Sequence, residues 1–427
     1  MKILLVGGGG REHALAWKIA QSSLVEQLWA APGNPGIARH ARCLDIAVDD
    51  ADGLAGFAKG HDADLVVVGP EQPLVAGLAD RLRAKGLAVF GPSQRAAAIE
   101  GSKAYAKRLM AEHGVPTARF ATFDDAAAAR RYCRERGVPC VVKADGLAAG
   151  KGAIVCATLD EADAAIAQCL ERREFGTAGT RVVVEEFMQG EEVSLFVLAG
   201  AGGVFPLAAA QDHKTVFDGD RGPNTGGMGA YSPVPSFDEA MQARVMREIV
   251  EPTLAGLAAD GAPFTGVLYV GLMLTLTGPR VVEFNCRFGD PECQPIMMGM
   301  SEDLVPLLLA VARGDRLPAP RSASGGRAAV CVAIASGGYP GRYPTGLEIT
   351  GIAEAESRPG VQVFQAGTVR REGRLYTNGG RVLGVTAVAD DLAAAIAAAY
   401  EGVRAIHFEG MHYRTDIGRR ALEVRAT

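Results

Sequence analysis

The sequence has no apolar run long enough to cross a membrane as a helix. Its longest apolar runs, 65–68 and 267–276, fall far short of the roughly 20 residues that such a helix needs. No segment of signal-peptide type opens the chain, because the apolar residues 2–6 run directly into four glycines. We therefore expect a cytoplasmic protein that does not bind membranes.

A basic excess and paired cysteine motifs are also missing. The 44 Lys and Arg residues are outnumbered by 49 Asp and Glu residues, which disfavours a nucleic-acid partner. The eight cysteines include no Cys-x-x-Cys pair and no cluster with zinc spacing. Cys140 and Cys331 have apolar neighbours, so we expect buried, reduced thiols rather than disulfides or metal ligands.

Glycine (54 residues) and apolar residues (48%) are abundant in this chain of 427 residues. A length near about 150 residues per domain predicts two or three domains. Up to residue 101, continuous apolar runs alternate with amphipathic segments, which is typical of a parallel α/β sheet. We predict strands at 3–6, 65–68 and 88–90, and helices at 11–21 and 75–85.

After residue 101 the pattern indicates an α+β unit inserted in a larger one, then a linker at 318–326 and a C-terminal α+β unit. The predicted helices are 103–113, 124–136, 159–170, 302–313 and 392–406. The predicted strands are 140–143, 153–156, 181–185, 191–198, 267–276, 280–284, 328–335, 361–364 and 382–389.

Two glycine-rich turns have the composition of phosphate-binding loops. Residues 7–11 join a strand to a helix, where free N–H groups attract anions, although a simple turn would look the same. The loop 143–152 has lysines at both ends of small residues, but Asp145 and Gly152 stand where a Walker A loop needs Gly and Ser or Thr. A flap over nucleotide phosphates fits better, with a solvated hairpin as the alternative.

Two strand ends carry acidic or amide side chains. Glu283 and Asn285 are two residues apart and so share one face, with Arg287 next along it. Oxygen ligands of this kind suit Mg²⁺, and the arginine could hold a transferring phosphate. Residues 185–188 end another strand and could bind adenine and ribose. An exposed strand end and an acidic turn are the respective alternatives.

The segment 212–230 has little periodicity and is predicted to be a long loop. Loops of this length in compact domains are usually functional, and its glycines would allow close approach of a ligand. His213 could act as a base, but a histidine that fixes the loop is the favoured interpretation.

Taken together, these segments resemble the phosphoribosylamine–glycine ligase family of the ATP-grasp superfamily, over almost the whole chain. The most specific motifs are Gly226-Gly227-Met228-Gly229-Ala230-Tyr231-Ser232-Pro233 and Asn285-Cys286-Arg287-Phe288-Gly289-Asp290-Pro291-Glu292. The resemblance implies a multidomain α/β and α+β fold. Its expected parts are an N-terminal domain (1–101), an ATP-grasp core (102–122 and 191–320), an inserted mobile lid (123–190) and a C-terminal domain (327–427).

The resemblance also implies the reaction ATP + glycine + 5-phosphoribosylamine → ADP + phosphate + glycinamide ribonucleotide, through glycyl phosphate, in purine biosynthesis. ATP and Mg²⁺ or Mn²⁺ are the implied cofactors. The implied partners are these small molecules, with a transient contact to the amidotransferase that makes phosphoribosylamine. A monomer or a homodimer is expected.

Site residues follow from the matching positions. The implied ATP-binding residues are Lys103, Lys143, Gly150, Lys151, Glu185, Glu186, Phe187, Met188 and Glu192. The implied phosphoribosylamine-binding residues are Gly8, Gly9, Gly10, Arg11, Glu12, Asn34 and Glu71. Glu283 and Asn285 would bind the metal, and Arg287, Lys143, Asp212 and Asn224 would be catalytic.

Two departures from the superfamily pattern stand out. The strand at 266–272 lacks the additional metal-binding carboxylate that many ATP-grasp enzymes carry there, and Gly8 replaces a frequent Asn. The alternatives are another purine-pathway ATP-grasp enzyme, a nucleotide-binding module without ligase activity, and a nicotinamide dehydrogenase. The last is disfavoured because Glu12 or His13 replaces the third glycine of the dinucleotide fingerprint.

Overall fold

The computed structural model describes residues 1–148, 152–319 and 326–423. Its N-terminal part is a parallel sheet of order β3-β2-β1-β4-β5. Ile3 and Leu5 of β1 lie in one hydrophobic core and Leu4 and Val6 in another, so both faces of the sheet are covered, as its continuous apolar runs predict. The elements are β1 (Lys2–Gly7), α1 (Gly10–Ile19), β2 (Gln27–Pro32), β3 (Arg42–Cys43), α2 (Ala51–Gly60), β4 (Leu65–Val68), α3 (Glu71–Val75), α4 (Leu78–Ala84), β5 (Val89–Phe90) and α5 (Gln94–Gly101).

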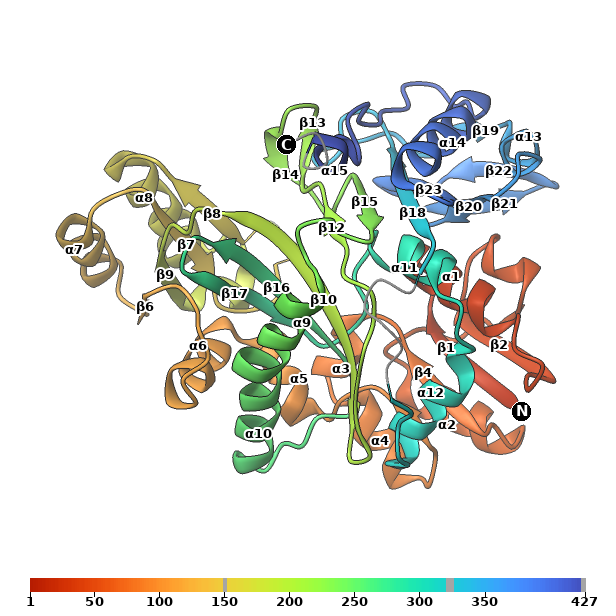
Figure 1. The fold of residues 1–427 in the computed structure, drawn as a ribbon, viewed down its shortest axis with the longest axis horizontal. Helices are drawn as coiled ribbons and strands as arrows, with labels where there is room; N and C mark the ends of the chain where they lie inside the picture. The colour runs from red at the N-terminus through yellow and green to blue at the C-terminus, as the bar shows by residue number, and fades with distance from the viewer. Residues whose placement is uncertain (149–151, 320–325, 424–427) are drawn as a thin grey trace.

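The centre of the molecule is an antiparallel sheet of order β11-β10-β16-β17 (Figure 1). Its strands are β10 (Glu191–Gly200), β11 (Gly203–Pro206), β16 (Gly266–Thr275) and β17 (Gly278–Asn285). The accompanying helices are α6 (Lys103–Glu112), α9 (Glu239–Val245), α10 (Glu251–Ala259), α11 (Cys293–Gly299) and α12 (Leu304–Arg313), and a π-helical turn joins α9 to α10. Within the described ranges, no single helix has the length and hydropathy to span a membrane; only α11 and α12 together do, and they meet at a bend of 116°.

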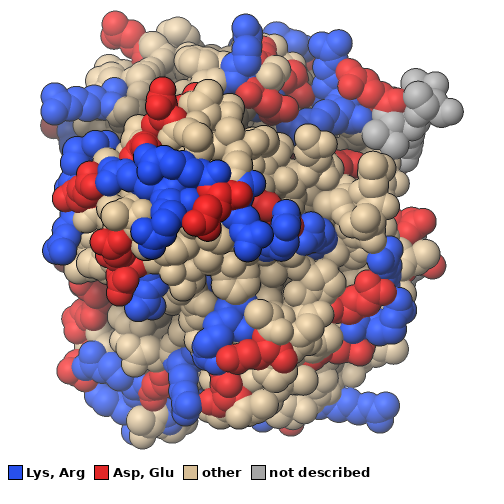
Figure 2. Space-filling view, turned by 90° about the vertical axis from the view of Figure 1, so that its left-hand side faces the viewer, with Lys and Arg blue, Asp and Glu red and all other residues tan. Residues whose placement is uncertain are grey.

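A separate small unit, called the lid below, lies at the left of Figure 1. Its sheet has the order β6-β9-β7-β8, and it has its own hydrophobic core, which includes Cys133, Val142 and Val184. Figure 2 faces this side and shows basic and acidic side chains intermixed, in keeping with ion pairs such as Arg134–Asp163 at 3.1 Å. The elements are β6 (Phe120–Phe123), α7 (Ala126–Arg136), β7 (Cys140–Ala144), β8 (Ala153–Cys156), α8 (Leu159–Ile166) and β9 (Val182–Glu186).

The C-terminal unit contains a sheet of order β12-β15-β18-β23-β20 and a smaller one of order β19-β22-β21. Its elements are β18 (Ala328–Ala335), β19 (Glu348–Ile349), α13 (Ile352–Glu356), β20 (Val361–Gln365), β21 (Thr368–Arg371), β22 (Arg374–Thr377), β23 (Arg381–Ala389), α14 (Leu392–Ala405) and α15 (Arg419–Glu423).

The segment predicted to be one long loop, 212–230, instead contains short strands. They are β12 (Gln211–Asp212), β13 (Thr215–Phe217), β14 (Arg221–Asn224) and β15 (Gly229–Ser232). β15 pairs with β18, almost a hundred residues later in the chain, so local periodicity could not reveal it. The C-terminal sheet therefore includes strands from both sides of the predicted linker. The predicted domain boundaries themselves stay predictions.

The cysteines agree with the sequence-based expectation. All eight are free, and all but the partly exposed Cys43 are buried.

Candidate active site

The strand β17 brings the predicted metal ligands to the centre of the molecule. Glu283 lies opposite Gly271, and Asn285 lies opposite Tyr269 of β16. With its amide oriented to satisfy its neighbours, Asn285 donates from Nδ2 to Glu100 at 2.9 Å. Burial by itself would raise the pKa of Glu283, but the nearby lysines, Lys214 first among them, lower it overall. Glu283 is therefore ionised at neutral pH.

Two of the predicted lysines, which come from different units, lie near enough to Glu283 to act on its charge. Lys143, on the lid strand β7, donates to the carbonyl oxygen of Val282 at 3.0 Å. Lys103, at the start of α6, donates to the carbonyl oxygen of Gly146 at 3.1 Å. Burial lowers the pKa of Lys103, although Glu283 opposes this shift. The structure thus places positive charge from both sides beside one carboxylate.

Glu185 holds a third lysine that sequence reasoning did not single out. Its Oε2 atom lies 3.0 Å from both Lys143 Nζ and Lys107 Nζ. Burial lowers the pKa of Lys107 to about 8 despite this partner. No motif indicated Lys107; only its side chain on the inward face of α6 explains its burial.

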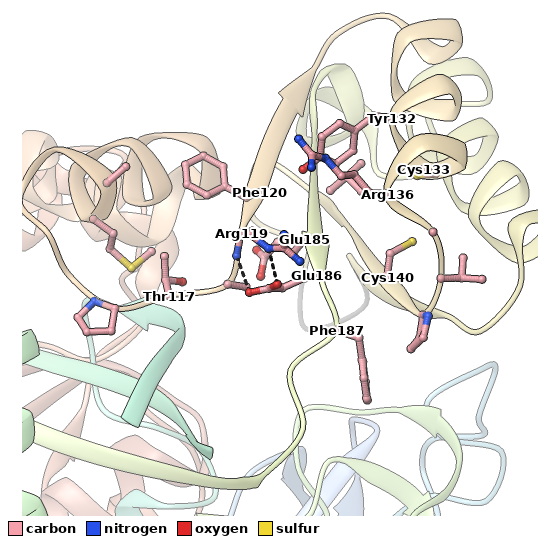
Figure 3. Close-up of a pocket in the computed structure, with 18 of the residues that line it drawn as sticks. Thr117, Arg119, Phe120, Tyr132, Cys133, Arg136, Cys140, Glu185, Glu186 and Phe187 are labelled. Carbon is pink, nitrogen blue, oxygen red and sulfur yellow. Dashed lines mark hydrogen bonds and ion pairs between the residues drawn. The ribbon is translucent and has the colours of Figure 1, made fainter. Parts of the chain in front are cut away.

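The acidic residue that ends β9, Glu186, is paired with two arginines. The carboxylate of Glu186 binds Arg119 at 2.7 Å and Arg280 at 2.9 Å, while Met188 is buried and Phe187 is 39% exposed. Figure 3 shows Arg119 facing Glu186, with Phe187 pointing away from them.

A hollow of about 830 Å³ lies along this turn. Its lining includes Thr117, Tyr132, Arg136, Cys140 and the residues 185–187. The lysines and β17 residues described above do not line it. Three predicted ATP-binding residues, Glu185, Glu186 and Phe187, line the hollow, whereas the predicted phosphate-binding lysines and metal ligands lie outside it.

Two side chains of segment 212–230, those of Asp212 and Lys214, lie near Glu283. Lys214 forms an ion pair with Glu192. Burial raises the pKa of Asp212 to about 7, and Glu292, Glu192 and Glu283 add to this against Lys214. Glu292 is itself buried. It was part of a family motif, but it was not predicted to be a site residue. Asn224, at the end of β14, is exposed.

The glycine loop before α1 is tied down by protein side chains. The N–H of Gly9 donates to Glu12 at 2.7 Å. Asn34 uses both ends of its amide within the chain, since Nδ2 donates to Gly8 O at 2.9 Å and Oδ1 accepts from Gly36 N at 2.8 Å.

A chain of alternating charges connects this loop to β17. Glu71 Oε2 lies 3.7 Å from Arg11 and 3.3 Å from Arg287. Arg287 then pairs with Glu100 at 2.9 Å, and Glu100 also accepts from the N–H of Cys286 at 2.7 Å. Arg287, which was predicted to be catalytic, is therefore in direct contact with Glu71, which was predicted to bind phosphoribosylamine. Glu100 was missed, because nothing in its local sequence distinguishes it from an exposed helix residue.

Two predicted ATP-binding residues, Gly150 and Lys151, lie outside the described residues.

The comparisons with known proteins decide the family. Profiles described as the N, ATP-grasp (A) and C domains of phosphoribosylglycinamide synthetase match residues 1–100, 101–293 and 329–420. The chain belongs to the phosphoribosylamine–glycine ligase family. This confirms the resemblance, the predicted fold class and the assignment as an ATP-grasp ligase.

Relatives from the same family match over their full length. The phosphoribosylamine–glycine ligase of Caulobacter vibrioides is 53% identical, with 100% of this chain and 99% of that protein covered. That of Brucella melitensis is 52% identical, with 99% of each covered. The crystal structure of the Thermotoga maritima ligase superposes with a TM-score of 0.84 at 32% identity, covering 97% of this chain and 100% of that one.

Proposed function

We propose that the protein ligates glycine to 5-phosphoribosylamine, the two compounds that the names of its relatives in Caulobacter and Brucella state for those proteins. In the same reaction ATP is converted to ADP and phosphate. The observation that carries the proposal is the convergence of Lys103, Lys143, Glu283 and Arg287 on one strand end. Two units of the fold supply cations to one carboxylate there, which suits a polyphosphate held with a divalent metal.

In this proposal ATP lies between the lid and the central sheet. Lys103 and Lys143 bind its phosphates. The backbone of 185–188 binds adenine, since the carboxylates of Glu185 and Glu186 are already paired. Glu192 binds the ribose after exchanging its partner Lys214.

Glu283 and Asn285 fit a magnesium or manganese site. Glu283 is ionised, and the amide of Asn285 adds a neutral oxygen. Among the described residues no cluster of three or more His, Cys, Asp or Glu side chains is arranged to hold a metal, so phosphates and water would complete the coordination, as Mg²⁺ prefers. When bound, the metal neutralises charge on the transferring phosphoryl group.

The proposed reaction has two steps. A carboxylate oxygen of glycine attacks the γ-phosphorus of ATP, ADP leaves, and glycyl phosphate forms. The amine nitrogen of phosphoribosylamine then attacks the acyl carbon, and phosphate leaves as the amide bond forms. Arg287 stabilises the negative charge that develops on the acyl phosphate, beside Arg11 and Glu71 on the phosphoribosylamine side. Asp212 and Asn224 belong to the segment that we assign to the glycine pocket.

The test is ADP release with Mg²⁺-ATP, glycine, and phosphoribosylamine generated in place from ribose 5-phosphate and ammonia. We expect turnover only when both co-substrates are present. ADP release that needs formate or bicarbonate instead of glycine would favour the other purine-pathway ATP-grasp enzymes, and ATP binding without any turnover would favour a binding module.

A further inference from the structure

Arg381, the first residue of β23, contacts the active-site segment from the C-terminal unit. Its Nη1 donates to the carbonyl oxygens of Gly226 at 2.6 Å and Gly227 at 3.2 Å. It also donates to the carbonyl oxygen of Asp290, and Nη2 lies 3.2 Å from the Asp290 carboxylate. One guanidinium therefore joins two of the motifs that are most specific to the family.

The direction of this side chain follows from an irregularity in the sheet. Ile334 pairs with Leu383 but Ala335 pairs with Arg381, so β23 carries one extra residue at this point. Such a bulge turns the neighbouring side chains away from their regular direction, and bulges are frequent beside active sites.

The glycines of the segment make room for the guanidinium. A Cβ atom on Gly226 would lie 3.1 Å from Arg381 Cζ. Gly227 has φ +110°, and a Cβ there would lie 2.4 Å from Pro291 Cδ. The N–H of Gly226 donates to the hydroxyl of Tyr339 at 3.0 Å. The backbone is thus held on several sides by groups from the C-terminal unit and from the 285–292 motif.

Asp290 extends this contact to the third unit of the fold. Its carboxylate accepts from Gln294 Nε2 at 2.9 Å. Burial would raise the pKa of this carboxyl, but the charges of Arg381 and Arg11 lower it overall. Arg11 is the second residue of α1, the helix that follows the glycine loop of the N-terminal unit. Arg381, through Asp290, therefore links residues 226–227 to the side of the site that faces phosphoribosylamine in the proposed function.

We propose that Arg381 is a positioning residue of the glycine site: its guanidinium holds the backbone of residues 226–227 in the conformation that binds glycine and keeps it in register with Asp290. The proposal rests on the proposed function, because it takes segment 212–230 as the wall of the glycine pocket. A misplacement of such a wall by about 1 Å can cost up to about a hundredfold in rate.

Arg381→Ala is expected to raise the KM for glycine about tenfold, while the KM for ATP changes by less than about twofold, since a binding wall and not the nucleotide site is disturbed. Hydrogen exchange at the amides of residues 226–228 should become faster, without a change in the lid. Arg381→Lys keeps one donating group, so its KM for glycine and its exchange rates should lie between those of the wild-type protein and those of Arg381→Ala.

Arg374→Ala is the matched control, because Arg374 is a surface arginine of the same unit whose partner is Glu348 at 3.2 Å; it should leave both constants unchanged. Unaltered exchange at residues 226–228, or equal changes in the KM for glycine and for ATP, would overturn the proposal. If the wild-type protein used another acid than glycine, the proposed function would fail, and the exchange measurement would still decide whether Arg381 holds the segment.

Discussion

The guanidinium of Arg287, whose side chain is 18% exposed, lies between two carboxylates that come from different parts of the chain. Glu71 begins α3, whereas Glu100 lies near the end of α5. Burial disfavours the charged guanidinium, but these carboxylates outweigh it and raise the pKa of Arg287. A charge with two partners is held in one orientation, which is the property that a phosphate-binding group needs.

Replacing Arg287 with Lys should lower kcat about a hundredfold, because one ammonium cannot reproduce the planar, forked contacts to Glu71 and Glu100. Steady-state kinetics with saturating ATP and glycine measures the effect. A thermal melt should show that the fold persists. Wild-type kcat in this variant would mean that Arg287 does not touch the reacting groups.

Asn285→Ala should likewise reduce turnover strongly, by about a hundredfold, and raise the Mg²⁺ concentration needed for half-maximal rate. The substitution also leaves Glu100 without one donor, so the free energy of unfolding should fall by about 1–3 kcal/mol. Activity assayed against a magnesium titration, with urea unfolding in parallel, separates these effects. Unchanged activity would contradict the metal assignment.

At the scale of the element, hydrogen bonds join the lid to the start of α6, in addition to the chain connection between them. Asp145, just after β7, accepts from the N–H of Ala104 at 2.7 Å and from Ser102 Oγ at 2.9 Å. The first turn of α6, which carries Lys103, therefore shares a carboxylate with the start of the lid loop. A movement of the lid would therefore also displace Lys103, because Asp145 is bonded to the residues on either side of it.

Helix α2 offers a stability test that is independent of the active site. Gly56 lies in its exposed middle, and a Cβ there would meet nothing within 4 Å. Gly56→Ala should therefore raise the free energy of unfolding by about 0.5–1 kcal/mol. Gly53→Ala is the control of opposite sign, since its Cβ would lie 2.2 Å from Asp50 Oδ2 and disturb the helix cap. Urea unfolding of both variants checks the pair.

At the scale of the whole molecule, the N-terminal and C-terminal units meet around a buried histidine. His13 Nδ1 accepts from the N–H of Gln365 at 2.7 Å, and its ring packs against Phe364 and His40. Burial lowers the pKa of His13 to about 3, and His40 and Arg39 add to this. The interface therefore contains a neutral histidine at all ordinary pH values.

Acid should weaken this interface in a predictable direction. Between about pH 6.5 and about pH 3 the unfolded chain binds a proton at His13 and the folded protein does not. As the pH is lowered through this window, the free energy of unfolding should therefore decrease, by up to about 1.4 kcal/mol per pH unit. His13→Gln, which keeps an acceptor, should reduce that slope in urea titrations at about pH 7, 6 and 5. His407→Gln, at an exposed position, should not; equal slopes in all three proteins would contradict the assignment.

The sequence by itself was sufficient for the strands β4, β8 and β18, whose predicted and observed bounds coincide. Each is a short apolar run, and the residues that mark its two ends lie directly beside it in the sequence. The motifs at 143–152 and 283–292 could be found in the sequence in the same way, because the spacing of their residues is local. The family, the fold class and the ligase class could therefore be predicted.

Only the tertiary structure could decide how these motifs are held together. Glu100, Lys107 and Arg381 have no local signal, since their roles depend on partners such as Arg287, Glu185 and Gly226 that are between 78 and 187 residues away. β15 exists because it pairs with β18, not because of its own composition. Periodicity reports which face of an element is apolar; which distant charge a buried charge meets is decided when the units pack.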